Sequence, residues 1–241
     1  MQAVTFFQDL KSLSLEAYER YAVEVVERFG FCPWARSARE SGDVALRVIF
    51  SADLDDFSES LAVLSELHQA PEQTSGAASA PDIALLIYPL LDVDRLGFED
   101  YVRQLRSTAE GPPHRLDAFA MAAFHPAANA DLGHPDRLVP FVRRSPDPTL
   151  QLVRKSALSS IKGLTQGTAF LDVSQLSLES LQALSVPPTK AVRERIAEQN
   201  LATVQEVGPA AIEAVLADIQ SAREVGHQRL QQRYGQRGPQ R

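Results

Sequence analysis

Hydrophobic residues recur at three- and four-residue steps near the start of the chain. This period predicts a helix over residues 14–29 with one buried face. Ser14 is suited to cap the start of that helix, and Gly30 is suited to end it in a left-handed conformation. The buried face is predicted to comprise Leu15, Tyr18, Ala22, Val25, Val26 and Phe29.

Three segments have the hydrophobic patterns of β-strands. Residues 44–50 alternate between apolar and polar positions, as a half-buried strand does, while residues 82–89 and 117–126 are continuous apolar runs, typical of strands covered on both faces. Helical patterns over residues 53–68 and 92–106 lie between them. This order predicts an α/β or α+β fold: a single domain with a central sheet of three to five strands and helices packed on it.

The C-terminal half has weaker patterns. Residues 150–158 are predicted to form a helix, and residues 168–173 a further strand. The chain after Pro188 is predicted to be helical to about Tyr234. We expect residues 1–207 to form the α/β domain and residues 208–241 a helical extension with a frayed, basic tail.

Composition excludes several classes of protein. The 241 residues are 44% hydrophobic, and 24 basic residues stand against 31 acidic ones, a formal charge of −7. That balance argues against binding to nucleic acid, because such proteins neutralise phosphates with a basic excess. The N-terminus lacks the pattern of a signal peptide, and the longest apolar run is about half the length needed to cross a bilayer. We therefore expect a cytoplasmic protein without a membrane partner.

The single cysteine is the first candidate for chemistry. Cys32 lies in the segment GFCPWARSAR, where Pro33 fits the first position of a helix and Cys32 its N-cap. The helix dipole and unpaired N–H groups would lower the pKa of a thiol there, and Arg36 would add positive potential. The alternative is that Cys32 is an unreactive hydrophobic side chain packed beside Trp34.

A histidine is the second candidate. His125 lies at the carboxyl end of a predicted strand, where ligands of open α/β sheets gather, and Pro126 follows it. Its imidazole would serve as a general base, a phosphate partner or a metal ligand, or it would bond a loop carbonyl. Cys32, His125 and His134 would form a zinc site, but their spacing is a weak signature, so no metal is predicted.

The segment RRSPDPT is the third candidate. Arg144 is able to hold a carboxylate or phosphate with two donors, and Ser145 lies beside it. Thr149 is predicted to cap the following helix, whose open N-terminus would bind an anion, and Arg154 would join from that helix. The alternative is a rigid turn with solvated arginines.

Together, FCPWAR, AFHP and RRSPDPTLQLVR resemble a bacterial family defined as a domain of unknown function. The family carries a Cys-Pro-Phe-Ala segment, a Phe-His-Pro strand end and an Arg-Ser-Pro-x-Pro-Thr stretch, and VRERIAEQNLATVQEVG is similar to its closing helix. Ala127 and Arg143 depart from the pattern, which has an acidic residue and an asparagine there. The resemblance covers roughly residues 15–207 and falls on Cys32, Pro33, Ala35, His125, Pro126, Arg144, Ser145, Pro146, Pro148, Thr149 and Arg154.

These features predict a cysteine-dependent enzyme that acts on a small anionic metabolite by acyl or related group transfer, or by hydrolysis. Cys32 would be the nucleophile and His125 the general base. No dinucleotide or P-loop fingerprint occurs in the sequence, so no cofactor is expected. The alternatives are a non-catalytic sensor of an anionic ligand, a Cys/His metal-binding protein, or a protein that forms homo-oligomers through its C-terminal helices. The substrate site is predicted to comprise Arg144, Ser145, Thr149, Arg154, Trp34 and Arg36.

Overall fold

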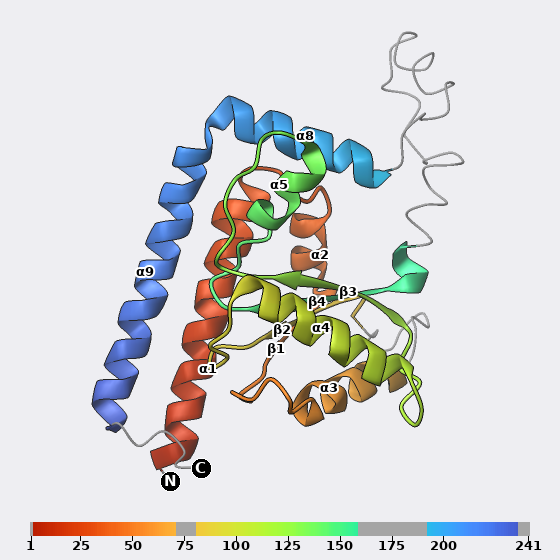
Figure 1. Ribbon diagram of the computed structural model, residues 1–241. Helices are drawn as coiled ribbons and strands as arrows, with labels where there is room; N and C mark the ends of the chain where they lie inside the picture. Colours follow the sequence, from red (N-terminus) through yellow and green to blue (C-terminus); the bar gives the residue numbers. More distant parts are fainter. Residues whose placement is uncertain (1, 71–80, 159–191, 236–241) are drawn as a thin grey trace.

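The computed structural model describes residues 2–70, 81–158 and 192–235 (Figure 1). At its centre is a four-stranded mixed sheet in the order β1-β2-β4-β3. β1 and β2 are parallel, and β4 is antiparallel to both β2 and β3. The predicted α+β domain with a central sheet is thereby confirmed. The strands are β1 (Val44–Val48), β2 (Ile83–Ile87), β3 (Phe119–Phe124) and β4 (Thr149–Arg154).

Two helices cover one face of the sheet: α3 (Ser58–Gln69) and α4 (Arg95–Glu110). Successive side chains of a strand point to opposite faces, so alternate residues of each strand enter this core. Phe98, Tyr101 and Leu105 of α4 are buried against them. The strand residues on this side are Ala84, Leu86, Phe119, Met121, Leu150 and Leu152.

The remaining helices pack on the other face, where Leu85, Ile87 and Phe124 meet them. Tyr21 and Val25 of the first helical segment and Phe141 of α5 complete this second core. Figure 1 shows α1 and α9 side by side at one edge of the molecule. The helices are α1 (Gln2–Tyr21), η1 (Ala22–Glu27), α2 (Ala35–Ser41), α5 (Pro135–Val142), α8 (Val192–Val207) and α9 (Pro209–Tyr234).

The helix predicted over residues 150–158 is wrong in its first part, since Thr149–Arg154 is strand β4. Leu150 and Leu152 alternate with Gln151, and β4 pairs with a strand on each side. Those two ladders outweigh the local helical pattern. The strand predicted over residues 168–173 lies outside the described residues.

The first helix is longer than its hydrophobic pattern predicts. It begins at Gln2, so Ser14 is buried within α1 and does not cap it. The predicted left-handed Gly30 is confirmed, with a φ of 66°. The helical C-terminus is also confirmed, but Gly208, with a φ of 85°, divides it into α8 and α9.

The C-terminal helix α9 is held along α1 by close packing and by polar contacts. A Cβ on Gly226 would lie 2.5 Å from a methyl carbon of Leu13, so a larger residue at this crossing would require the Leu13 side chain to shift. Arg20 pairs with Asp218 at 2.7 Å. Residues 209–234 therefore share an extensive contact with the N-terminal helix.

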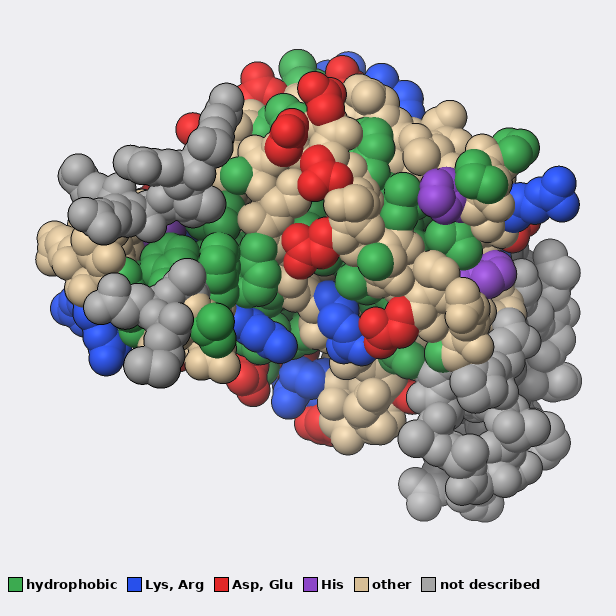
Figure 2. All heavy atoms as spheres, turned by 90° about the horizontal axis from the view of Figure 1, so that it is seen from below, with side chains coloured by type: hydrophobic (Ala, Val, Ile, Leu, Met, Phe, Trp, Pro, Cys, Tyr) green, Lys and Arg blue, Asp and Glu red, His purple; other side chains and the backbone are tan. Residues whose placement is uncertain are grey.

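The described surface carries charges of both signs. On the face shown in Figure 2, acidic, basic and hydrophobic side chains are intermixed. Across the described part of the chain, no helix is long and apolar enough to span a membrane.

Candidate functional site: an apolar cleft beside Cys32

A cleft of about 990 Å³ lies between the sheet and the helices on the α1 side. Strand side chains form its floor, and α1, η1, α2, α5 and α8 supply its walls. Most of its lining is hydrophobic, a composition typical of small-molecule sites. The floor residues are Val44, Leu46, Ile83, Leu85, Phe124 and Gln151.

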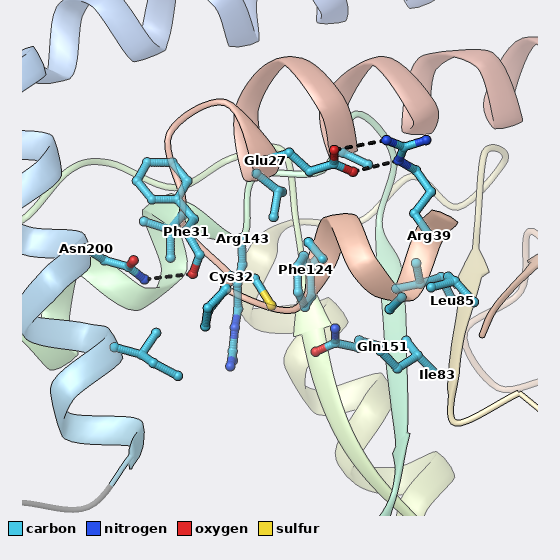
Figure 3. Close-up of a pocket in the computed structure, with 18 of the residues that line it drawn as sticks. Glu27, Phe31, Cys32, Arg39, Ile83, Leu85, Phe124, Arg143, Gln151 and Asn200 are labelled. Atoms are coloured by element: carbon cyan, nitrogen blue, oxygen red, sulfur yellow. Dashed lines mark hydrogen bonds and ion pairs between the residues drawn. The ribbon is translucent and has the colours of Figure 1, made fainter. Parts of the chain in front are cut away.

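Cys32 lines this cleft from the turn between η1 and α2 (Figure 3). The turn is closed by a hydrogen bond from the Ala35 N–H to the Cys32 carbonyl, at 3.2 Å. Asn200 of α8 also donates to the Phe31 carbonyl at 3.3 Å, which fixes the chain next to the thiol. The structure therefore places the thiol in the wall of a cavity.

The expected N-cap geometry is only partly present. Helix α2 begins at Ala35 with Trp34 as its N-cap, so Cys32 lies two residues before the cap. Burial raises the pKa of the Cys32 thiol, and hydrogen bonds from the backbone of Trp34 and Ala35 oppose that rise without cancelling it. The structure thus differs from the sequence-based expectation of a lowered pKa, because burial outweighs the backbone donors.

Arg143 is the cleft residue that sequence reasoning missed. Its guanidinium lies 5.5 Å from the centre of the Phe124 ring, and burial lowers its pKa. Among the described residues, no carboxylate forms an ion pair with it. Arg193 lines the same cleft and adds positive charge close enough to lower that pKa further.

The other charged and polar groups of the cleft differ in their partners. Glu27 is held by Arg39 through contacts of 2.6 and 3.0 Å, and this pairing lowers the pKa of Glu27. Arg193 pairs with Asp136 at 3.2 Å. Gln151 projects from the floor, and within the described part of the chain its amide has no hydrogen-bond partner. Arg143 and Gln151 thus remain available to a ligand.

His125 does not line this cleft. Its Nδ1 accepts a hydrogen bond from the Ala127 N–H at 3.1 Å, and its Nε2 lies 3.0 Å from the Val93 carbonyl. These partners require a neutral ring with the proton on Nε2, and burial lowers its pKa. Both nitrogens are engaged by the backbone, so this geometry does not bring a general base to Cys32.

Residues 145–149 of the Arg-Ser-Pro segment, which we call the joint, form a compact set of polar contacts within the fold. Ser145 Oγ and Thr149 Oγ1 both donate to the Asp147 carbonyl, at 2.6 and 2.9 Å. Thr149 begins a strand, so the helix start expected there does not exist. The Asp147 carboxylate is buried and lies 2.5 Å from Arg223 of α9, which also donates to the Pro89 carbonyl.

The predicted anion clamp of Arg144 and Arg154 is not assembled. Arg154 is at the far end of β4, and five strand residues correspond to roughly 17 Å. Its guanidinium is buried and donates to the carbonyls of Leu67 and Pro81. Arg144 lies outside the cleft and donates to the Pro126 carbonyl at 3.0 Å.

The two remaining predicted substrate residues also lie outside the cleft lining. Trp34 is partly exposed at the N-cap of α2, and the exposed Arg36 side chain reaches Glu27 at 3.5 Å. His134 caps α5 and accepts from the Asp136 N–H. The described ranges contain no group of three or more His, Cys, Asp or Glu side chains placed to hold a metal ion.

Two features of the sequence could have indicated the missed residues. Arg143 and Arg144 are adjacent, and neighbouring side chains in a non-helical segment diverge, so either could have faced a cavity. Gln151 is a polar residue between leucines, which marks the face of a strand that is not fully packed.

Comparison with known proteins gives a family without a known activity. No curated protein and no solved structure matches the chain. The model of the family described as "Protein of unknown function (DUF1415)" matches residues 15–184. This range includes Cys32, His125 and the Arg-Ser-Pro segment. The chain belongs to the DUF1415 family.

Proposed function

We propose that the cleft binds a small, mainly apolar molecule that carries an acidic group, and that Arg143 pairs with this group. The observation that carries the proposal is the half-buried guanidinium of Arg143, whose pKa is lowered by burial and which has no carboxylate partner among the described residues. A desolvated charge is costly unless it is paired and hydrogen-bonded. An acid on the ligand supplies the missing partner.

The shape and lining of the cleft support an apolar body for this ligand. Its volume of about 990 Å³ is at the upper end of the range for small-molecule sites. Leu46, Leu85 and Phe124 offer an apolar floor, and the Gln151 amide offers one uncharged donor and acceptor. These groups favour a hydrocarbon or aromatic body with one acidic end.

Thiol chemistry at Cys32 is the second candidate, because the thiol lies in the same wall and has two backbone N–H groups directed at it. In this reaction Sγ would bond to the carbonyl carbon of an activated acyl group, and the bond to the leaving group would break. The thiol proton would pass to the leaving group, and water would then hydrolyse the thioester. The raised pKa makes this step slow without a base from the ligand.

Calorimetric titration with decanoate and with 1-decanol tests the binding proposal. The wild-type protein should bind both, and Arg143→Met should weaken decanoate binding about tenfold or more, because a charge-assisted hydrogen bond is lost. Binding of 1-decanol should change little. Arg144→Met is the matched control, since that neighbouring arginine lies outside the cleft. Failure of decanoate to bind, or equal binding to Arg143→Met, would overturn the proposal.

The stability of the ligand-free variant separates lost affinity from lost folding. Arg143→Met replaces an unpaired, desolvated charge with an apolar side chain of similar length. We expect its free energy of unfolding to rise by about 1 kcal/mol, measured in urea. Cys32→Ser should retain decanoate binding. A covalent acyl-protein with p-nitrophenyl decanoate, found for wild type and not for Cys32→Ser, would support the second candidate.

A further inference from the structure

A second pocket, which we call the arginine pocket, lies on the other side of α5. Its volume is about 430 Å³, and three arginines supply all of its charged lining. They come from the start of α4, from α5 and from the segment after α5. Pro140 of α5 lines both this pocket and the cleft, so α5 separates them. The lining residues are Arg95, Ala127, Ala128, Asn129, Arg137, Pro140 and Arg144.

The existing partners of these arginines leave donors free. Arg137 is 3.8 Å from Asp131, and Arg144 is 3.6 Å from Glu213, both longer than a hydrogen bond. Arg95 pairs with Glu99 on the next turn of α4. None of these three acidic partners lines the pocket, so all the charged residues of its lining are basic.

The inner arginine is held in place before any ligand arrives. Arg144 Nε donates to the Pro126 carbonyl at 3.0 Å, and its guanidinium carbon lies 5.6 Å from the centre of the Phe141 ring. Side-chain exposure rises from 23% at Arg144 through 35% at Arg95 to 70% at Arg137. An anion that enters would therefore pass the exposed Arg137 before it reaches Arg144, which is partly desolvated and already held by its contacts.

His125 connects the elements that form the arginine pocket. Its Nδ1 accepts from Ala127 in the loop that lines the pocket, and its Nε2 bonds Val93, two residues before Arg95. The imidazole thus connects the loop to the start of α4 without lining the arginine pocket itself. This contact makes His125 a positioning residue, which does not touch the ligand.

We propose that the arginine pocket binds the phosphate groups of a small phosphorylated molecule. A guanidinium has five N–H donors, so the three arginines keep donors beyond those used by Glu99, Asp131 and Glu213, and these match the multiple oxygens of a phosphate or diphosphate. A single carboxylate would occupy the donors of one guanidinium only. Asn129 at the rim supplies a further side-chain amide. This site rests on residues separate from those of the cleft, so it stands independently of the function proposed there.

Titration of the full chain with inorganic pyrophosphate, followed by calorimetry, tests the site. Arg144→Gln should weaken binding about tenfold, and the double variant Arg137→Gln/Arg144→Gln should weaken it further, since each lost charge-assisted bond reduces the affinity. Arg103→Gln is the matched control, because Arg103 is an exposed arginine of α4 outside the pocket. Unchanged thermal unfolding temperatures would show that the variants are folded.

Three results would overturn the inference. They are no binding of pyrophosphate at millimolar concentration, equal weakening by Arg103→Gln, and equal affinity for citrate, a tricarboxylate. Arg143→Met should leave pyrophosphate binding unchanged. Failure of this site and failure of the cleft therefore give different results, because decanoate binding responds to Arg143 and pyrophosphate binding to Arg144.

Discussion

The cleft and the joint at residues 145–149 differ in how their polar groups are paired. In the joint, the hydroxyls of Ser145 and Thr149 share the Asp147 carbonyl, and the Asp147 carboxylate faces Arg223. In the cleft, Arg143 lies beside the Phe124 ring, and no carboxylate of the described residues forms an ion pair with it. The polar groups of the joint pair with one another, whereas Arg143 lacks such a partner among the described residues, which is why we propose a ligand for it.

Asp147→Ala should give the largest effect on stability. It leaves the largely buried Arg223 without its carboxylate, and breaking a buried ion pair on one side costs at most about 3–5 kcal/mol. Urea denaturation would measure the loss. Asp218→Ala is the control, because Asp218 is exposed and pairs with Arg20 at the surface, where a loss of about 0.2–1 kcal/mol is typical. A small loss for Asp147→Ala would show that the joint does not depend on the pair.

Alkylation of Cys32 by iodoacetamide tests the environment of the thiol in the cleft. Burial raises the pKa of this thiol, so the labelling rate should rise more than about 20-fold between pH 7 and pH 9, as the reactive thiolate appears. Cys32 is the only cysteine, so mass spectrometry reports on one site. A rate that changes less than about twofold over this range would indicate a thiolate already formed at pH 7.

His125 should give the smallest effect, a pH dependence of stability. Burial lowers its pKa, so the unfolded chain takes up a proton at a higher pH than the folded chain does. Stability should therefore fall as the pH drops below the ordinary histidine pKa of roughly 6.5, and level off below the folded pKa. His227 shifts in the same direction, so the test is a comparison with His125→Gln.

The His125→Gln variant should lose less stability than wild type between pH 7 and pH 5. The control is His114→Gln, which should follow the wild-type curve, because His114 is exposed in a turn at the surface and is not an N-cap. Parallel curves for wild type and His125→Gln would show that the hydrogen bonds to Val93 and Ala127 do not depend on a neutral ring.

The sequence alone determined the main elements and their order. Periodic hydrophobic positions indicated a helix, two continuous apolar runs indicated the strands β2 and β3, and Gly30 marked a left-handed turn, because these signals depend on local geometry. The run of β3 was expected to be a central strand, but β3 lies at the edge of the sheet, next to β4. The expected resemblance to a family of unknown function is also confirmed, because the family model matches residues 15–184. What the motifs could not give was the partner of each polar side chain.

Which residues face a cavity depends on the tertiary structure. β4 is a strand because β2 and β3 offer hydrogen-bond ladders on both sides. As a result, Arg154 lies far from Arg144, and Gln151 lies in the floor of the cleft. The sequence neighbours Arg143 and Arg144 line different pockets, because α5 separates the two pockets. A local pattern specifies a backbone conformation. Solvation and charge pairing depend instead on segments distant in sequence, and these two properties distinguish an arginine with a structural role from one that is available to a ligand.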